Sequence, residues 1–271
     1  MTSAAHFFWI DAFAEAPFAG NPAAVCLLEH ELSDAMQQDL AAEFNLSETV
    51  FLMRLGADFA IRWFTPTLEV PLVGHATLAA AHAVLAHFAP DRSEVVFISR
   101  ESGRLAARRE AGGYAIELPS DTTTSCPIPA DLVEGLGRVP VAVRRGRHYL
   151  AIFDDENAIA DLKPDFAALT RLDLPTIIAT APSRHVDYVL RFFAPANGVP
   201  EDPVSGVAQC SLVPYWADRL GRSRLVSNQL SARSGRMTCW LSHGGVTIAG
   251  PCRTIAEGRL SPDFVRTRAG R

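Results

Sequence analysis

The chain has 271 residues, a formal net charge of -5 and a pI of about 5.9. Hydrophobic residues make up 48% and charged residues 20%, which is typical of a globular protein and excludes disordered and fibrous classes. The negative charge argues against nucleic acid as the main partner, since no overall positive field attracts phosphates. The N-terminal residues lack the pattern of a signal peptide, and no run approaches the roughly 20 apolar residues of a membrane span. We therefore expect a cytoplasmic protein without a membrane partner.

Residues suited to metal or cofactor chemistry are few. The only lysine, Lys163, precedes Pro164 in a polar run, an unfavourable place for a cofactor held as a Schiff base. His82 and His87 occur without a second ligand motif, and no glycine-rich nucleotide motif is present. The cysteines form no Cys-x-x-Cys pair and are expected to be reduced, mostly packed thiols; they are Cys26, Cys126, Cys210, Cys239 and Cys252. The sequence thus predicts neither a metal site nor a cofactor.

An internal repeat organises the chain. The run from Ile61 to Pro66 resembles the run from Leu190 to Pro195, and each reads as an aromatic-rich strand ended by proline. In each copy an acidic residue and a proline follow, and then a glycine opens a helix-like stretch. The first such stretch extends from Gly74 to about His87 and the second from Gly206 to about Leu220, in which Pro214 must lie early or cause a kink.

The remaining pattern is rich in strands. Short apolar runs separated by turn residues predict strands at 95–98, 114–118, 141–143, 148–153 and 246–248. The segment 119–129 is rich in Ser, Thr, Asp and Pro and is predicted to be a linker. We therefore expect an α+β protein with two pseudo-symmetric lobes, each a curled sheet around a helix. The N-terminal lobe would comprise residues 1–118 and the C-terminal lobe residues 119–271, with a C-terminal tail able to return to the first lobe.

The two glycine-opened helices suggest a binding function. Free N–H groups and the positive end of the helix dipole make a helix N-terminus a seat for an anion, and glycine allows a ligand to approach the backbone. Pseudo-symmetry can direct both N-termini at one cleft, which suits proton transfer next to a carbonyl or carboxyl group. The alternative is that Gly74 and Gly206 only permit tight turns.

Several separated motifs carry a family resemblance. They occur in order along most of the chain: Asp11 to Phe13, Pro17 to Val25, Asn45 to Thr49, Phe64 to Pro66, Gly74 to Thr77, Glu201 to Gly206, Pro214 to Trp216 and Arg219 to Gly221. Together they resemble the PhzF-like family of phenazine-biosynthesis isomerases. The resemblance implies a diaminopimelate-epimerase-like fold, a homodimer, and a small, anionic substrate bound without a cofactor.

The resemblance also suggests roles for individual residues. It implies that Glu48, in the Leu-Ser-Glu-Thr motif, is the general acid/base in the cleft between the lobes, where burial would raise the pKa of its carboxyl. Asp202 and His75 match residues placed around the substrate. On the residues alone, Glu48 also reads as a helix-end or capping glutamate near Asn45. His75 alone reads as a helix-start histidine satisfied by a backbone carbonyl.

Further residues match the substrate-binding parts of the family. Gly74 and Gly206 correspond to glycines whose neighbouring N–H groups bind a carboxyl or carbonyl group. Asn21 lies in the Gly-Asn-Pro turn that lines the family's cleft, although Asn before Pro is also an ordinary turn residue.

The chain departs from the family pattern after the Asp-Pro pair. Val207 replaces a serine that touches substrate and Gln209 replaces a histidine, so the phenazine substrate itself is in doubt. The residues before the two glycines are Val73 and Ser205, where racemases of this fold have two thiols; two-thiol racemisation is therefore not expected.

The leading hypothesis is a cofactor-independent isomerase or epimerase acting through Glu48. Asp202 and His75 would assist, and Asn21, Gly74, Ser205, Gly206 and Val207 would bind a small carboxylate-bearing or cyclic metabolite. A catalytically silent small-molecule binding protein of the same fold is the alternative. A hydrolase with Ser205 as nucleophile is disfavoured because no Gly-x-Ser-x-Gly elbow surrounds that residue.

Overall fold

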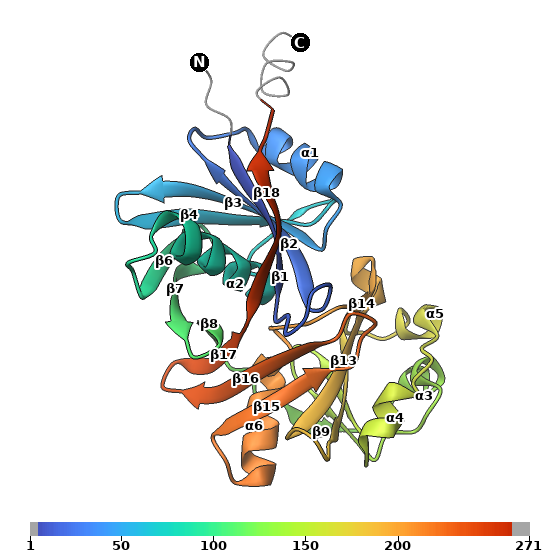
Figure 1. Cartoon of the computed structure of the whole chain (residues 1–271). Coiled ribbons are helices and arrows are strands. Elements are labelled where there is room, and N and C mark those ends of the chain that lie inside the picture. The colour runs from blue at the N-terminus through green and yellow to red at the C-terminus, as the bar shows by residue number, and fades with distance from the viewer. Residues whose placement is uncertain (1–4, 262–271) are drawn as a thin grey trace. The chain divides into compact units, whose positions relative to one another are not determined.

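The computed structural model describes residues 5–261 (Figure 1). The described chain divides into two compact units. The first unit comprises residues 5–12, 22–116 and 251–261, and the second comprises residues 13–21 and 117–250. None of the helices within this described range is long and apolar enough to cross a membrane.

The first unit is a mixed sheet with one enclosed helix. Its strands pair in the order β18-β1-β2-β3-β4-β6-β7-β8, with β5 beside one end of β4. The strands are β1 (His6–Ala12), β2 (Asn21–Leu28), β3 (Glu48–Leu55), β4 (Asp58–Phe64), β5 (Glu69–Val70), β6 (Glu94–Ser99), β7 (Gly103–Glu110), β8 (Gly113–Leu118) and β18 (Cys252–Arg259). The helices are α1 (Asp34–Phe44) and α2 (Gly74–Ala83), which continues as the π-helical turn η1 (Val84–Phe88).

The second unit repeats this plan. Its strands pair in the order β9-β10-β11-β12-β13-β15-β16-β17, with β14 beside one end of β13. The strands are β9 (Thr124–Cys126), β10 (Ala142–Arg145), β11 (Tyr149–Ile152), β12 (Ile177–Pro182), β13 (Tyr188–Ala194), β14 (Val199–Asp202), β15 (Arg224–Gln229), β16 (Gly235–Ser242) and β17 (Gly245–Gly250). The helices are α3 (Ala130–Leu136), α4 (Glu156–Ala160), α5 (Phe166–Leu169), α6 (Gln209–Leu220) and the 3-10 turn η2 (Pro195–Asn197).

The predicted repeat is confirmed strand by strand. In both units the sheet continues through a parallel pair, an antiparallel pair and a second parallel pair: β2-β3, β3-β4 and β4-β6 in the first, and β11-β12, β12-β13 and β13-β15 in the second. The same ion pair recurs as well. Arg62 binds Glu69 through two bonds of 2.7 and 2.6 Å, and Arg191 binds Glu201 through two bonds of 2.7 and 2.8 Å. The predicted α+β fold is therefore confirmed.

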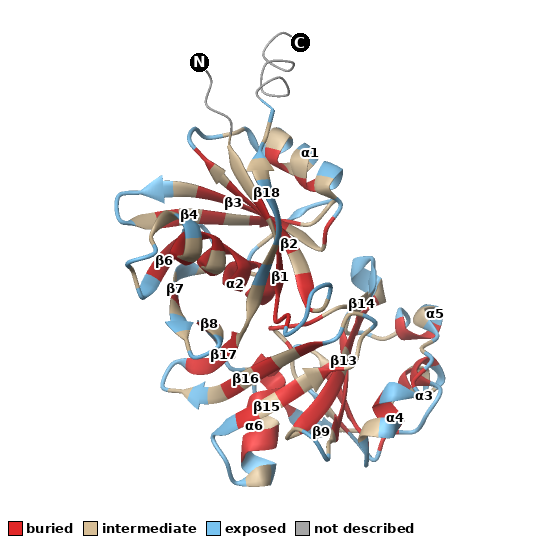
Figure 2. Cartoon of the chain, in the orientation of Figure 1, coloured by how far each residue is buried: buried red, intermediate tan, exposed pale blue. Residues whose placement is uncertain are grey.

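Helix α2 is enclosed by the first unit. Nine of its ten residues are buried, which is possible because they are mostly alanine and other residues with small or apolar side chains (Figure 2). Its N-terminal turn is closed by Thr77, whose N–H and hydroxyl both bond to the carbonyl oxygen of Val73, at 3.0 and 2.6 Å. The helix begins at Gly74 as predicted and its π-helical continuation ends at Phe88.

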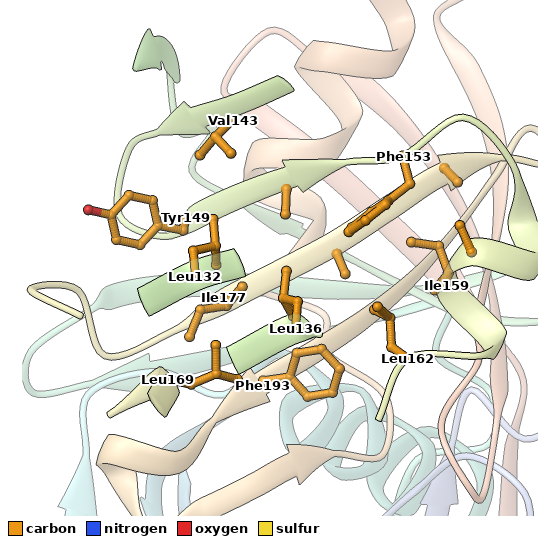
Figure 3. Packing of buried hydrophobic residues seen from close by; sticks show 14 of the residues in the cluster. Leu132, Leu136, Val143, Tyr149, Phe153, Ile159, Leu162, Leu169, Ile177 and Phe193 are labelled. Carbon is orange, nitrogen blue, oxygen red and sulfur yellow. The ribbon is translucent and has the colours of Figure 1, made fainter. Parts of the chain in front are cut away.

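The second unit has a separate apolar core on the side of its three small helices (Figure 3). Leu132 and Leu136 from α3, Ile159 from α4 and Leu169 from α5 pack against side chains of β11 to β13, including Phe193. These short helices have little stability of their own, so this packing holds them in place.

The segment predicted to be a linker is instead part of the second unit. Strand β9 pairs with β10, and the N–H of Asp121 donates to the carbonyl oxygen of Cys210 at 2.9 Å. That carbonyl is available because Pro214, four residues later in α6, has no N–H to bond it. The polar residues of this segment therefore attach it to the rest of the second unit by hydrogen bonds, and they do not form a linker.

The Asp121 carboxylate strengthens this docking by accepting from the Ser211 hydroxyl at 2.7 Å and from the N–H of Arg147 at 3.1 Å. We predict that Asp121→Ala lowers the free energy of unfolding by about 1–3 kcal/mol, because both donors lose their acceptor. Urea denaturation checks this result. Asp218→Ala is the matched control, since Asp218 is an exposed aspartate on α6. Equal stability of the two variants would contradict the role given to Asp121.

His82 is a half-buried base on the enclosed helix. Its ring nitrogens lie 3.2 Å from the Tyr114 hydroxyl and 2.8 Å from the Thr254 hydroxyl. Burial, followed by the charges of His87 and Arg109, lowers the pKa of His82 from 6.5 to about 4. Between these two pH values the unfolded chain binds a proton that the folded chain does not, so the folded state loses stability as the pH falls from 6.5 to 4.

We predict that His82 contributes up to about 3 kcal/mol to this loss of stability at acid pH. His82→Gln has no proton to take up, so its free energy of unfolding should fall less steeply between pH 6.5 and 4 than that of the wild type. Urea denaturation at a series of pH values measures both slopes. Parallel curves for the two proteins would exclude His82 as a source of the acid sensitivity.

Candidate functional site

Glu48 is the first residue of strand β3 in the first unit. It pairs with Ala23 across the parallel β2-β3 ladder. The preceding helix α1 ends at Phe44, and Asn45 takes the left-handed conformation that closes it. Glu48 is therefore not a capping residue, and the reading that places it at a helix end is wrong. Its side chain is 16% exposed and therefore largely enclosed.

His75 faces this carboxyl from the start of α2. Its Nε2 atom lies 2.9 Å from Oε2 of Glu48, and its side chain is 5% exposed. The structure thus brings together two of the residues that the sequence singled out, the first residue of a strand and the second residue of a helix. A carboxyl group beside an imidazole at this distance is suited to accepting, holding and returning a proton.

The start of α2 adds hydrogen-bond donors to the same place. Val73 is extended and caps the helix without a side-chain bond, and Gly74 opens it. The N–H groups of the first helical turn have no acceptor within the helix. Because Gly74 has no side chain, an anionic group can approach these donors closely.

Asp202 and Asn21 are brought together in the second unit. Nδ2 of Asn21 donates to Oδ1 of Asp202 at 2.7 Å and to the carbonyl oxygen of Val204 at 3.0 Å. Asn21 is fully buried, whereas Asp202 is half-buried at the end of β14. Asn21 therefore has a defined task beyond that of a turn residue, since it orients the Asp202 carboxyl.

The helix predicted to open at Gly206 starts three residues later. Residues 206–208 form a turn, and α6 begins at Gln209. Its first bonds join residues three apart, from Gln209 to Gly206 and from Cys210 to Val207, each at 3.1 Å. This tighter winding, which is common at helix ends, explains the difference. Ser205 is buried and its N–H already donates to Oε1 of Gln229 at 2.8 Å.

Comparisons with known proteins agree with this architecture. The family model described as phenazine biosynthesis-like protein (PhzC-PhzF) matches residues 10–258. The chain belongs to this family. An uncharacterized isomerase of Pseudomonas aeruginosa is 46% identical over 253 residues, covering 93% of this chain and 97% of the relative. The crystal structure of a PhzF-family protein of Enterococcus faecalis superimposes with a TM-score of 0.92 at 38% identity, covering 95% of this chain and 99% of that one.

A structure of lower sequence identity shares the fold. A predicted epimerase of Pseudomonas aeruginosa has a TM-score of 0.69 at 21% identity, covering 95% of this chain and 99% of that one, and shares the fold. The family and its relatives that are named isomerases make this chain an isomerase-type enzyme.

The contact between Glu48 and His75 has no ionisable counterpart in the second unit of this PhzF-family chain. Thr49 pairs with Phe64 as Ile177 pairs with Phe193, so Thr176 stands in the second unit where Glu48 stands in the first. Val207 follows Gly206 as His75 follows Gly74. Neither counterpart has an ionisable side chain, so the repeat shares the backbone arrangement while Glu48 and His75 are particular to the first unit.

Gln209 has a structural role in this family member. It is fully buried, and its Oε1 accepts a bond of 2.5 Å from the hydroxyl of Tyr188. The Tyr188 ring stacks on Trp216 with ring centroids 5.4 Å apart. Gln209 therefore links the first turn of α6 to strand β13.

The cysteines are all free thiols. Burial raises the pKa of Cys210 to about 12, so this thiol near the second glycine stays protonated at neutral pH. In residues 5–261 no group of three or more His, Cys, Asp or Glu side chains is arranged to hold a metal ion.

Gln229 is a functional candidate that the sequence did not reveal. Its amide bonds both the carbonyl of Asp202 and the N–H of Ser205. It lies at a strand end with an ordinary turn-forming sequence after it, and no motif surrounds it. Only the tertiary structure, which brings residues 24 to 27 positions apart together, identifies it.

We predict that Asn21→Leu lowers the free energy of unfolding by about 1–3 kcal/mol. The side chain keeps its approximate volume, but the buried carbonyl of Val204 and the Asp202 carboxyl lose their shared donor. The control is Asn197→Leu at an exposed site of the same unit. If chemical denaturation finds the two variants equally stable, the Asn21 bonds do not hold this part of the chain.

Proposed function

We propose that this isomerase moves a proton on a small carboxylate-bearing or cyclic metabolite without a cofactor, with Glu48 as the general acid/base. The observation that carries the proposal is the 2.9 Å approach of the Glu48 carboxyl and the His75 imidazole at the start of α2. Membership of a family whose relatives are named isomerases supports it.

The chemistry follows from the groups at this place. The Glu48 carboxylate takes a proton from a carbon next to a carbonyl or carboxyl group, and the electron pair of the broken C–H bond moves into that group. N–H donors at the start of α2 stabilise the negative charge that develops there. The protonated carboxyl then returns the proton to another position of the same molecule, so the isomer has the elemental composition of the substrate.

His75 holds the Glu48 carboxyl in place for both steps. The Nε2 atom lies against one carboxyl oxygen, which leaves the other oxygen to act on the substrate. Asp202, oriented by Asn21, is proposed to assist with the same substrate, together with Gly74, Ser205, Gly206 and Val207 as binding residues. An anionic substrate, a homodimer and a cytoplasmic location complete the proposal.

The test is a screen of pooled metabolites in heavy water. We predict that the wild type converts one metabolite into an isomer of the same composition and adds deuterium to it, as followed by chromatography and mass spectrometry. Glu48→Gln should lower this turnover by about 100-fold or more, because an amide cannot accept the proton at neutral pH.

Glu43→Gln is the matched control, since it makes the same chemical change at an exposed position of α1. It should keep the wild-type rate. An isomer formed equally fast by the Glu48→Gln variant would remove Glu48 from the acid/base role. The appearance of an isomer is decisive even where the same proton returns without exchange.

A further inference from the structure

In a short segment of the second unit, consecutive backbone groups bond to side chains from distant parts of the chain. Strand β14 ends at Asp202 and α6 begins at Gln209, so residues between them lie outside regular secondary structure. Four consecutive residues each use a backbone group to bond a distant side chain. The bonds are Gln229 Nε2 to Asp202 O (2.6 Å), Ser231 Oγ to Pro203 O (2.5 Å), Asn21 Nδ2 to Val204 O (3.0 Å) and Ser205 N to Gln229 Oε1 (2.8 Å).

Gln229 makes the first and the last of these bonds with one amide. It is the final residue of β15, fully buried, and its backbone is paired with Leu190 of β13 and Gly235 of β16. A carboxylate has no donor for the Asp202 carbonyl, and an apolar side chain has neither donor nor acceptor. The Gln229 amide therefore bonds the first and the last residue of the segment, Asp202 and Ser205, from a backbone position that the sheet fixes.

The chain after Gln229 holds the neighbouring turn as well. Nε of Arg233 donates to the carbonyl of Gly20 at 2.9 Å and Nη2 to that of Ala19 at 3.2 Å. The N–H of Gly20 in turn donates to the carbonyl of Ser234 at 2.7 Å. Residues 229–234 thus bond to two segments, residues 19–20 and residues 202–205. These two segments meet in the contact between Asn21 and Asp202.

We propose that Gln229 is a positioning residue of the isomerisation. Its amide fixes the orientation of the Asp202 carboxyl and of the turn at residues 206–208, which follows directly after Ser205. This proposal rests on the proposed function, because it takes Asp202 and Gly206 to act on the substrate.

Gln229→Glu gives a test that distinguishes hydrogen bonding from packing, because it preserves the shape of the side chain. A protonated carboxyl can donate to the Asp202 carbonyl and accept from the Ser205 N–H, whereas an ionised one cannot donate. Burial should raise the pKa of the introduced carboxyl above its ordinary value of about 4.3. The variant should therefore resemble the wild type at acid pH and lose the bond as the pH rises.

Two measurements follow the effect. Amide hydrogen exchange by NMR reports on the segment without any substrate. We expect Ser205 in Gln229→Glu to exchange about 10-fold faster than in the wild type at pH 7.5, and nearly as slowly as in the wild type at pH 5, relative to the amides of β12. For the metabolite found in the exchange screen, kcat should fall at least about 10-fold at pH 7.5 with KM little changed, and should recover relative to the wild type at lower pH.

Ser227→Ala is the control, since it removes a buried polar atom two residues earlier on the same strand. It should leave the Ser205 exchange rate and the pH profile of kcat as in the wild type. Unchanged Ser205 exchange in Gln229→Glu, or faster exchange with wild-type turnover, would overturn the proposal. A wild type that isomerises no metabolite would instead overturn the proposed function, while the exchange data would still show whether Gln229 holds the segment.

Discussion

The enclosure of helix α2 by the sheet of the first unit is the constraint on which the rest of the site depends. Polar groups on such a helix have no access to bulk water, so each must find a partner from the surrounding strands or loops. On α2, His82 meets this requirement with Tyr114 and Thr254, and Nε2 of His75 lies 2.9 Å from Oε2 of Glu48. The approach of His75 to Glu48 is thus one of the contacts that the enclosed helix makes through its polar side chains.

The two units share one backbone arrangement but carry different polar side chains. They share strand order, pairing direction and the Arg62–Glu69 and Arg191–Glu201 ion pairs. The position of Glu48 is occupied by Thr176 in the other copy, so the first unit carries the ionisable side chain. The second unit instead contains the segment 202–205, whose backbone groups bond to side chains that include Asn21. The proposed mechanism, in which one carboxylate both removes and returns the proton, makes use of this difference.

Much of this was accessible from the sequence because the signals are local. Short apolar runs separated by turn residues predicted several of the strands, and Gly74 with the alanines that follow it predicted α2 at its observed start. The sequence-based predictions were wrong where contacts between residues distant in sequence determine the local structure. Residues 119–129 fold into the second unit through the Cys210 carbonyl that Pro214 leaves available, and the turn at residues 206–208 delays α6. The bonds of Gln229 join positions distant in sequence, which no motif records.

The most direct test of the central claim follows one labelled hydrogen through the reaction. The substrate would carry deuterium at the carbon that loses the proton, and single turnovers in ordinary water would be stopped and analysed for label at the carbon that gains one. If Glu48 removes and returns the proton from its enclosed position beside His75, part of the deuterium appears at the second carbon. An isomer that never carries deuterium there would contradict transfer by a single carboxylate.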